Sequence, residues 1–287
     1  MYGLFAFLFQ NTLLLRGCTL FILGSIIGSF LNVVIYRLPI ILDKKEEANL
    51  NSNPEIDTHK VVETFNLVYP SSHCPVCKNR VPIWANIPIL GYFLTNGKCC
   101  YCKTKISVRY PALELITGLL FVLSGSISSD IVMLPAFLVF ISIVICLIVI
   151  DFDHMILPDE LTGVLLWAGL LFNLNGAIAG SLINAVLGVI VGYLLLWLLY
   201  WGFKFITKRD GMGYGDFKFL AAILAWVGYL YIVPVLLISS ILGIIYFVLG
   251  RLTGRVMSGH PIPFGPFLGI AGIITLLSHN FISIFIV

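Results

Sequence analysis

Two aspartates, Asp151 and Asp216, stand where a chain dissolved in hydrocarbon rarely carries a charge. Asp151 directly follows the uncharged run IVMLPAFLVFISIVICLIVI, and Asp216 closes the string GMGYGD shortly before the apolar run FLAAILAWVGYLYIV. An ionised side chain at membrane depth costs about 2.5 to 3.5 kcal/mol on insertion scales, so ionisable residues there are functional candidates. Two carboxylates that share a site cannot both ionise comfortably, so one keeps a proton while the other activates water. The pair therefore predicts peptide-bond hydrolysis of the aspartic protease type.

The two aspartates are expected to differ in role because they lie at opposite kinds of helix end. Asp216 opens a predicted helix, whose positive end favours the anion, whereas Asp151 closes one, whose negative end favours the protonated acid. We therefore expect Asp216 to act as the base and Asp151 as the acid, in a pair that titrates as a unit. The other acids of the loop after Asp151 fit a solvated surface equally well: Asp153, Asp159 and Glu160.

The glycines Gly213 and Gly215 just before Asp216 indicate a loop that contacts substrate. Glycine permits positive φ angles and lets another chain approach the backbone closely. An ordinary glycine turn between two helices is the alternative for this string. The non-helical string HPIPFGP, from His260 to Pro266, is a second candidate for binding substrate backbone, with a plain proline-rich loop as its alternative.

Four cysteines form two C-x2-C pairs separated by 21 residues. This pattern predicts a tetrahedral site of the zinc-ribbon type, in which four thiolates leave no open position and the metal is structural. A pair of disulfides is the alternative, but a reducing cytoplasmic location favours zinc. Cys100 completes no C-x2-C pair with the right partner and is expected to stand aside. The predicted zinc ligands are Cys74, Cys77, Cys99 and Cys102.

Composition excludes a soluble globule. The 287 residues are 59% hydrophobic and 11% charged, with a mean hydropathy of +1.02. We predict an all-α polytopic membrane protein of about eight transmembrane helices, with a small zinc-ribbon-like cytoplasmic domain inserted after the first helix. The predicted spans are 17–38, 111–128, 131–150, 161–176, 181–206, 217–232, 233–250 and 264–287.

The distribution of charge predicts the orientation of these spans. Every one of the 17 basic residues except Arg16 falls on one side of the predicted membrane, which is therefore the cytoplasmic side. Both aspartates fall on that side, as a shared site requires. The net charge of +3 thus reflects topology and membrane lipid, and it gives no indication of nucleic acid binding. The role of Arg16 has no explanation in the sequence.

We divide the chain into three parts: 1–38, the N-terminal segment and first helix; 39–110, the cytoplasmic loop; and 111–287, the helical peptidase core. The loop begins with the charged string DKKEEANLNSNPEIDTHK, a connector expected to carry no chemistry. From about residue 69 it is rich in Cys, Pro, Gly and Lys. Such a small domain has a thin core, so it needs a metal to hold its shape.

Five strings give the chain a specific resemblance. They are GSFLNVVIYRLP, CPVCKNRVPIWANIPILGYFLTNGKCCYCKTKISVRYPALELITG, IDFDHMILPDE, GMGYGDFKFLA and HPIPFGPFLGIAG. Over nearly its whole length the chain resembles the type IV prepilin leader peptidase/N-methyltransferase family, whose members are GxGD-type aspartic membrane proteases with two activities. The resemblance implies a bacterial inner-membrane enzyme that removes the short basic leader of type IV prepilins and type II secretion pseudopilins. It further implies methylation of the newly exposed amino group, commonly of phenylalanine, by S-adenosylmethionine.

The resemblance also implies roles for individual residues. The family's catalytic aspartates fall on Asp151 and Asp216, and its cytoplasmic cysteine cluster falls on the four predicted zinc ligands. A glycine linked with methyl transfer in the family's GKC string falls on Gly97. The residues alone identify no methyl-donor pocket, because no glycine string of the Rossmann type is followed by an acidic ribose partner. Asn32 and Glu114 are candidates to line such a pocket, and packing at helix ends is the alternative for both.

Other functions predict different features. A transporter has acids near the bilayer midplane and paired repeats, whereas these acids lie at one face and no repeat is visible. A non-catalytic pilus-assembly scaffold would tolerate loss of either aspartate. A peptidase without methylation would lack the cysteine loop, which this chain has. The identity of the prepilin, a role in pili or in secretion, and the oligomeric state stay open at this point.

Overall fold

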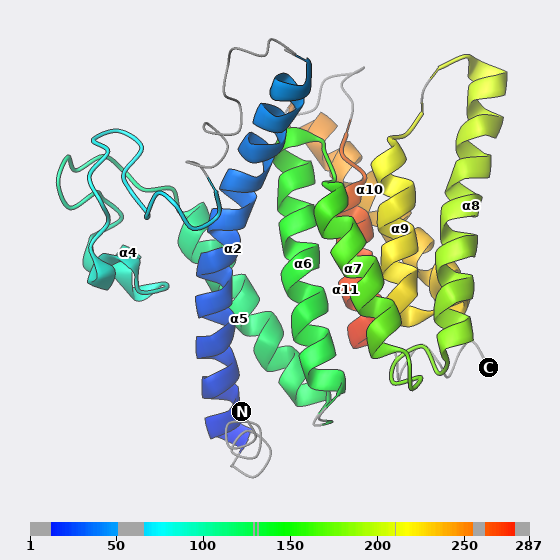
Figure 1. Ribbon diagram of the computed structural model, residues 1–287, viewed down its shortest axis with the longest axis horizontal. Helices are drawn as coiled ribbons and strands as arrows, with labels where there is room; N and C mark the ends of the chain where they lie inside the picture. The colour runs from blue at the N-terminus through cyan, green and yellow to red at the C-terminus, as the bar shows by residue number, and fades with distance from the viewer. Residues whose placement is uncertain are drawn as a thin grey trace. The chain divides into compact units, whose positions relative to one another are not determined.

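The computed structural model describes residues 13–50, 66–128, 130, 132–209, 211–254 and 262–278 (Figure 1). These residues form α-helices and two short 3-10 helices, with no β-strand in the part described. The chain separates by internal contacts into two compact units, Met1–Ser126 and Ile127–Val287. The predicted all-α class is confirmed, and the three-part division at residues 38 and 110 stays a prediction.

Each predicted span corresponds to a helix, but the helices differ in length. Five stretches within the described residues are long and apolar enough to cross a membrane. Four are the helices α2 (Leu13–Leu50), α5 (Arg109–Ile127), α6 (Met133–His154) and α8 (Leu182–Thr207), and the fifth, Tyr229–Leu252, contains α10 (Ile232–Leu252). The remaining three are shorter: α7 (Asp159–Phe172), α9 (Tyr214–Val227) and α11 (Gly265–Leu277).

Backbone geometry explains where α9 ends. The apolar pattern continues without a break through Val227, yet Gly228 has φ 89°, which a right-handed helix does not accept. The short 3-10 helix η2 (Tyr229–Tyr231) then leads into α10. The predicted boundary between these two helices near Tyr231 therefore falls a few residues too late. Residues 279–287, which the last predicted span includes, lie outside the described part.

In the first unit, α2 and α5 pack through glycines. A Cβ atom at Gly24 would lie 2.8 Å from Cα of Gly118, and one at Gly28 would lie 2.8 Å from Cα of Glu114. Gly24 and Gly28 are four residues apart, so they form one small face along α2, the pattern that lets membrane helices approach closely. The two helices therefore form a rigid base for the loop between them.

Three polar contacts attach that loop to the two helices. The buried Arg37 of α2 donates Nη1 to the Asn66 carbonyl at 2.9 Å and Nη2 to the Pro70 carbonyl. Asn32 of α2 donates Nδ2 to the carbonyls of Gly28 and Tyr110, each at 3.3 Å. Glu114 of α5 accepts the backbone N–H of Ile89 at 2.6 Å. The described part of the loop is thus held by α2 at Asn66 and Pro70 and by α5 at Ile89, while the Tyr110 contact joins α2 to the first turn of α5.

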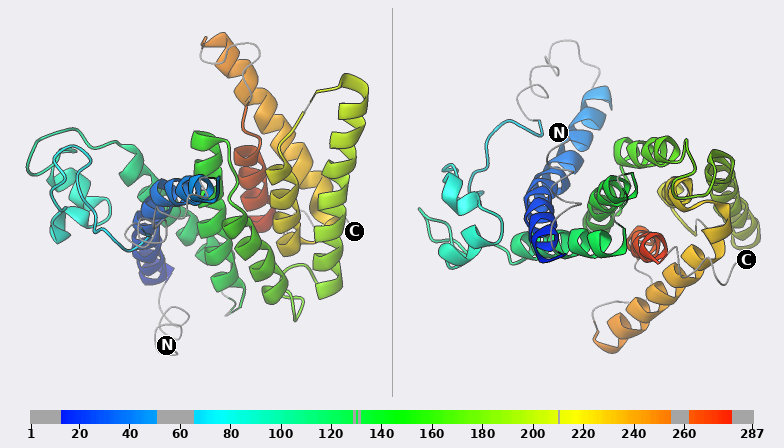
Figure 2. Two further views of the ribbon diagram at one scale, coloured as in Figure 1. Left: turned by 45° about the horizontal axis from the view of Figure 1, so that its top comes forward. Right: turned by 90° about the horizontal axis from the view of Figure 1, so that it is seen from below.

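In the second unit, α9 is the central helix and contacts α7, α8 and α11 (Figure 2). Its side chains from Phe219 to Val227 are all buried. Small residues on its neighbours let it fit: a Cβ at Gly188 of α8 would lie 2.6 Å from the Leu224 carbonyl oxygen, and one at Gly169 of α7 would lie 2.7 Å from the Trp226 ring. By contrast, α10 runs obliquely to the other helices and buries only Val235 and Ser239.

A buried asparagine fixes one end of the α7 and α9 pair. Asn173, fully buried, donates Nδ2 to the carbonyls of Ala225 and Trp226, each at 3.0 Å. Its Oδ1 accepts the backbone N–H groups of Ile178 and Ala179. Unpaired backbone groups are costly in an apolar environment, so one side chain here satisfies four of them. The aspartates lie toward the other end of the same pair of helices.

Candidate active site

Both predicted catalytic aspartates lie at helix ends in the second unit. Asp151 is in the last turn of α6, which ends at His154, and the left-handed Met155 that follows donates its N–H to the Asp151 carbonyl at 2.9 Å. Asp216 is in the first turn of α9, with its N–H directed to the Gly213 carbonyl at 3.2 Å. Both are buried, with 5% and 7% of their surface exposed. They are near enough for the charge of one to act on the other.

Gly265, at the start of α11, lies directly against Asp151. A Cβ atom there would stand 2.5 Å from Asp151 Oδ2 and 3.0 Å from its Cγ. The Gly265 amide acts on this carboxyl group electrostatically, yet Oδ2 is buried and has no partner of proper hydrogen-bond geometry among the described residues. A buried carboxyl oxygen without such a partner is a group available for chemistry.

Leu157 connects the two aspartate segments. A Cβ at Gly215 would lie 3.0 Å from Leu157 Cβ, and one at Gly265 would lie 3.3 Å from its Cδ1. Leu157 therefore fills the space that these two glycines leave. Leu157 has no reactive group, so nothing in the sequence singles it out. Gly265 is a sequence candidate only as part of the string HPIPFGP. Of that string, His260 and Pro261 lie outside the described residues.

The loop before Asp216 differs from expectation in its backbone. Gly213 has φ −78°, an ordinary extended value, and Gly215 is already helical, so neither uses the positive φ angles that glycine permits. Space explains the glycine at Gly215, because Leu157 packs against it. It also explains Gly211, where a Cβ would lie 2.7 Å from the Phe203 ring. At Gly211 and Gly215, the groups that approach the backbone closely are therefore side chains of the protein itself.

Three aromatic rings support the start of α9. The rings of Tyr200, Tyr214 and Phe217 have centroids 5.2 to 5.7 Å apart. Tyr200 lies on α8, and its hydroxyl accepts a hydrogen bond from Lys204 at 3.0 Å. Because Tyr214 and Phe217 flank Asp216 in the first turn, this packing fixes the direction in which α9 begins.

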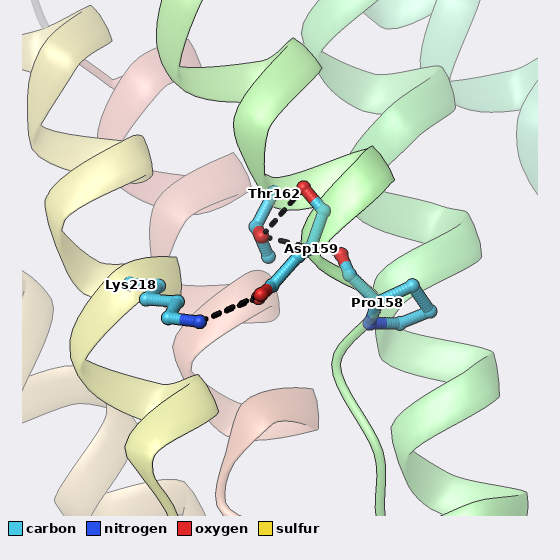
Figure 3. Close-up of polar contacts among 4 residues, drawn as sticks. All are labelled: Pro158, Asp159, Thr162 and Lys218. Atoms are coloured by element: carbon cyan, nitrogen blue, oxygen red, sulfur yellow. Dashed lines mark hydrogen bonds and ion pairs between the residues drawn. The ribbon is translucent and has the colours of Figure 1, made fainter. Parts of the chain in front are cut away.

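An ion pair joins the first turns of α7 and α9 (Figure 3). Lys218 Nζ lies 2.8 Å from both carboxylate oxygens of Asp159. The Thr162 hydroxyl donates to the carbonyls of Pro158 and Asp159, which steadies the turn that carries this carboxylate (Figure 3). The two side chains are 44% and 69% exposed. Asp159, for which the sequence suggested a solvated loop position, therefore has a specific partner two residues beyond Asp216.

The four predicted zinc ligands gather in the first unit. Their sulfur atoms all lie within 4.8 Å of one another. Cys74 Sγ is 3.7 Å from Cys102 Sγ, and Cys77 Sγ is 3.9 Å from Cys99 Sγ. Four sulfurs placed tetrahedrally at about 2.3 Å from a zinc ion lie about 3.8 Å apart, so the cluster fits that ion. The group does not include Cys100.

The two halves of the cluster repeat one backbone pattern. The N–H of Cys74 donates to the Asn79 carbonyl, and that of Cys99 donates to the Thr104 carbonyl, both at 2.9 Å. Each half contains a lysine with φ 59° and an isolated antiparallel bridge around it. The lysines are Lys78 and Lys103, and the bridges are His73 with Arg80 and Lys98 with Lys105. We call segments 72–81 and 97–106 the two knuckles.

Hydrogen bonds prepare two of the thiols for metal binding. The side chain and backbone of Thr104 lower the pKa of the Cys102 thiol to about 6. The backbone amides of Cys77 and Val76 hold the pKa of the Cys74 thiol below its ordinary value. Thiolate is the form that binds a metal ion, so both shifts favour occupation of the cluster.

Gly97 opens the second knuckle and contacts the short helix α4 (Leu90–Leu94). It has φ +64°, and a Cβ there would lie 2.7 Å from both Cζ and Oη of Tyr92. Its N–H also donates to the Tyr92 carbonyl at 2.9 Å. Only glycine meets both conditions without strain. Asn32 and Glu114, the two candidates for a methyl-donor pocket, instead hold the loop through backbone groups, which matches their packing interpretation.

We expect the cysteine cluster to bind one zinc ion per chain in the full-length protein. Substitution Cys74→Ser removes one of four sulfur ligands and should release most of the zinc, whereas Cys100→Ser should leave it bound. Elemental analysis of the purified proteins measures the ratio, and the absorption spectrum after cobalt replacement reports how many sulfurs bind. Equal zinc content in the two variants would contradict this assignment.

Two family models match the chain in succession. Residues 22–126 match the bacterial peptidase A24 N-terminal domain, and residues 138–248 match the type IV leader peptidase family. Curated relatives carry the name prepilin leader peptidase/N-methyltransferase. The relative from Aeromonas salmonicida is 45% identical over 259 residues, which cover 90% of this chain and 89% of the relative. That from Stutzerimonas stutzeri is 42% identical over 274 residues, covering 94% and 93%.

A third relative of the same name, from Pseudomonas aeruginosa, is 41% identical over 263 residues, which cover 91% of this chain and 89% of the relative. No solved structure matches the chain. The matches run through both units and include both aspartate segments and the cysteine loop. The chain therefore belongs to the type IV leader peptidase family.

Proposed function

We propose that this protein cleaves the basic leader peptide from type IV prepilins and type II secretion pseudopilins and then N-methylates the new N-terminal residue, commonly phenylalanine. The observation that carries the proposal is the pair of buried carboxyl groups at the end of α6 and the start of α9. The name shared by the relatives supports both activities. The reaction at the carboxyl pair is aspartic proteolysis.

The proposed mechanism assigns one proton to the pair. Ionised Asp216 takes a proton from water as the water oxygen attacks the scissile carbonyl carbon, and protonated Asp151 gives its proton to the carbonyl oxygen. Collapse of the tetrahedral intermediate breaks the C–N bond, and the leaving amine receives a proton from the pair. Helix ends support this division, because Asp216 stands at a positive N-terminus and Asp151 at a negative C-terminus.

We place the site at the cytoplasmic face of a bacterial inner membrane and assign eight transmembrane segments. The confinement of basic residues other than Arg16 to one predicted side supports the orientation. The deep burial of α9 supports counting this short helix as a membrane segment, because its neighbours shield it from lipid. A prepilin helix with its basic leader in the cytoplasm would present its cleavage site at this face.

The methyl donor implied for the second activity is S-adenosylmethionine. The described residues near Gly97 do not form a recognisable site for it, since Asn66 through Leu113 include no acidic side chain to hold a ribose. Glu114, the next carboxylate, accepts the Ile89 N–H. Our proposal for Gly97 is that it shapes the junction between α4 and the second knuckle.

The first test incubates a prepilin with S-adenosylmethionine and the purified protein in lipid nanodiscs. Wild-type protein should yield a shortened product that has gained the mass of one methyl group. Asp151→Asn and Asp216→Asn should each abolish cleavage, while Asp153→Asn, an exposed neighbour, should retain it. Mass spectrometry of the product and a thermal melt of each variant separate lost chemistry from lost folding. Full cleavage by a folded Asp216→Asn variant would favour a scaffold or transporter.

Gly265→Ala tests the contact with Asp151. The added Cβ would stand 2.5 Å from Oδ2, so the carboxyl group must move. A displacement of about 1 Å at a catalytic group costs on the order of a hundredfold in rate, and we expect a loss of that size in kcat. Gly163→Ala is the matched control, because nothing lies within 4 Å of a Cβ at that position. If both variants cleave at the wild-type rate, Gly265 has no part in positioning Asp151.

The Asp159–Lys218 ion pair is expected to position Asp216. An exposed pair of this kind contributes only about 0.2 to 1 kcal/mol to stability, so its loss should barely change the melting temperature. We expect Asp159→Asn and Lys218→Gln each to lower kcat about tenfold, which corresponds to about 1.4 kcal/mol, with little change in KM. The double variant Asp159→Lys with Lys218→Asp restores the pair with reversed charge and should regain activity. Rates that stay unchanged in both single variants would make this pair a surface feature only.

A further inference from the structure

Outside the candidate spans, one segment of the first unit exposes a dense group of large apolar side chains. Residues 82–94 contain the 3-10 helix η1 (Ile83–Asn86) and α4. Ile83 is 91% exposed and Phe93 is 68% exposed. We call this group the apolar face, and its members are Ile83, Trp84, Ile87, Leu90, Phe93 and Leu94.

The local fold turns these side chains outward. Helices η1 and α4 contact each other through their smallest residues, because no room for a Cβ is left between Gly91 and the Ala85 carbonyl. The small residues therefore occupy the inside of the segment, and the large ones have no inside position left. So many exposed large apolar side chains within thirteen residues indicate an interaction site.

Charge around the apolar face favours one class of partner. From Asn66 through Leu113 the chain has no Asp or Glu. Its basic side chains lie on or beside the two knuckles: Lys78, Arg80, Lys98, Lys103, Lys105 and Arg109. Each Lys or Arg near an anionic membrane surface adds about 1 kcal/mol of attraction. Glu114 contacts this segment, but its carboxylate accepts the Ile89 N–H. The charged residues that flank the face in sequence are otherwise basic, which is the composition of a segment that lies in a membrane interface.

The attachments of the loop keep this face near a bilayer. Arg37 of α2 holds Asn66 and Pro70 at the loop's beginning, and Asn32 of α2 holds Tyr110 at its end. Glu114 of α5 holds Ile89, which immediately precedes α4. Both α2 and α5 are long and apolar enough to span a membrane. The segment therefore has little freedom to leave the surface at which these two helices emerge.

We propose that residues 82–94 insert their apolar face into an anionic membrane leaflet, with the basic residues of the knuckles at the lipid phosphates. Trp84 lies at the start of the segment, and tryptophan is enriched at such interfaces. The occupant that we assign to this face is lipid. The inference depends on membrane embedding alone and is independent of the proposed enzymatic activities.

The test places a photoreactive benzoylphenylalanine at Phe93 of the full-length protein. The protein is reconstituted in nanodiscs of equal parts phosphatidylglycerol and phosphatidylcholine, and in nanodiscs of phosphatidylcholine alone. After irradiation and digestion, mass spectrometry identifies what has joined the peptide that contains α4. The same group at Glu46, an exposed acidic position near the end of α2 and away from the basic knuckles, sets the background.

We expect a lipid adduct at Phe93 at least several times above the Glu46 background, with a higher yield in the discs that contain phosphatidylglycerol. An adduct to a peptide from 127–287, or to a second chain, would overturn the proposal and identify a protein partner. A Phe93 signal no higher than background would overturn it as well, since the face would then lie in water. Equal yields in both kinds of disc would overturn the assignment to anionic lipid.

Discussion

The burial of α9 on all sides is the constraint on which the second unit depends. Its side chains from Phe219 to Val227 are all buried, so its neighbours and not solvent must fix it through packing. Gly188 of α8 admits its backbone and Gly169 of α7 admits the Trp226 ring, whose Nε1 donates to the Leu165 carbonyl of α7 at 2.8 Å. At its other end the aromatic rings around Tyr214 and the ion pair of Lys218 set the start of the helix. Together these contacts fix the position of Asp216.

The parts of the site that could be predicted from sequence are those with a local signature. Asp151 and Asp216 stand out because each borders an apolar run, and the cysteines stand out by their spacing. Leu157 and the Asp159–Lys218 pair have no such signature, because their roles arise from contacts between distant segments. The end of α9 was predicted too late for another reason. The apolar sequence continues past Gly228, whereas the helical conformation ends there because Gly228 has a positive φ.

The first unit follows a different rule from the second. Its small loop has few buried apolar residues, so polar contacts and sulfur ligands replace a core. The two knuckles share one hydrogen-bond pattern, in which the Gly97 carbonyl accepts from Ile106 as the Ser72 carbonyl accepts from Val81. The repeat explains why both cysteine pairs present their sulfurs alike. It also means that the requirement for glycine at Gly97 comes from Tyr92 and not from the knuckle pattern itself.

The shortness of α9 has a consequence for how water reaches a peptide bond. Fourteen residues, Tyr214–Val227, extend about 21 Å at 1.5 Å per residue, against a hydrocarbon layer about 30 Å thick. Its neighbours α7 and α11 are equally short. Because its neighbours shield α9 from lipid, the protein itself must make up the difference in length. We therefore expect the aspartate end of α9 to stop below the headgroups, within the protein, where a membrane helix can be hydrolysed without first leaving the membrane.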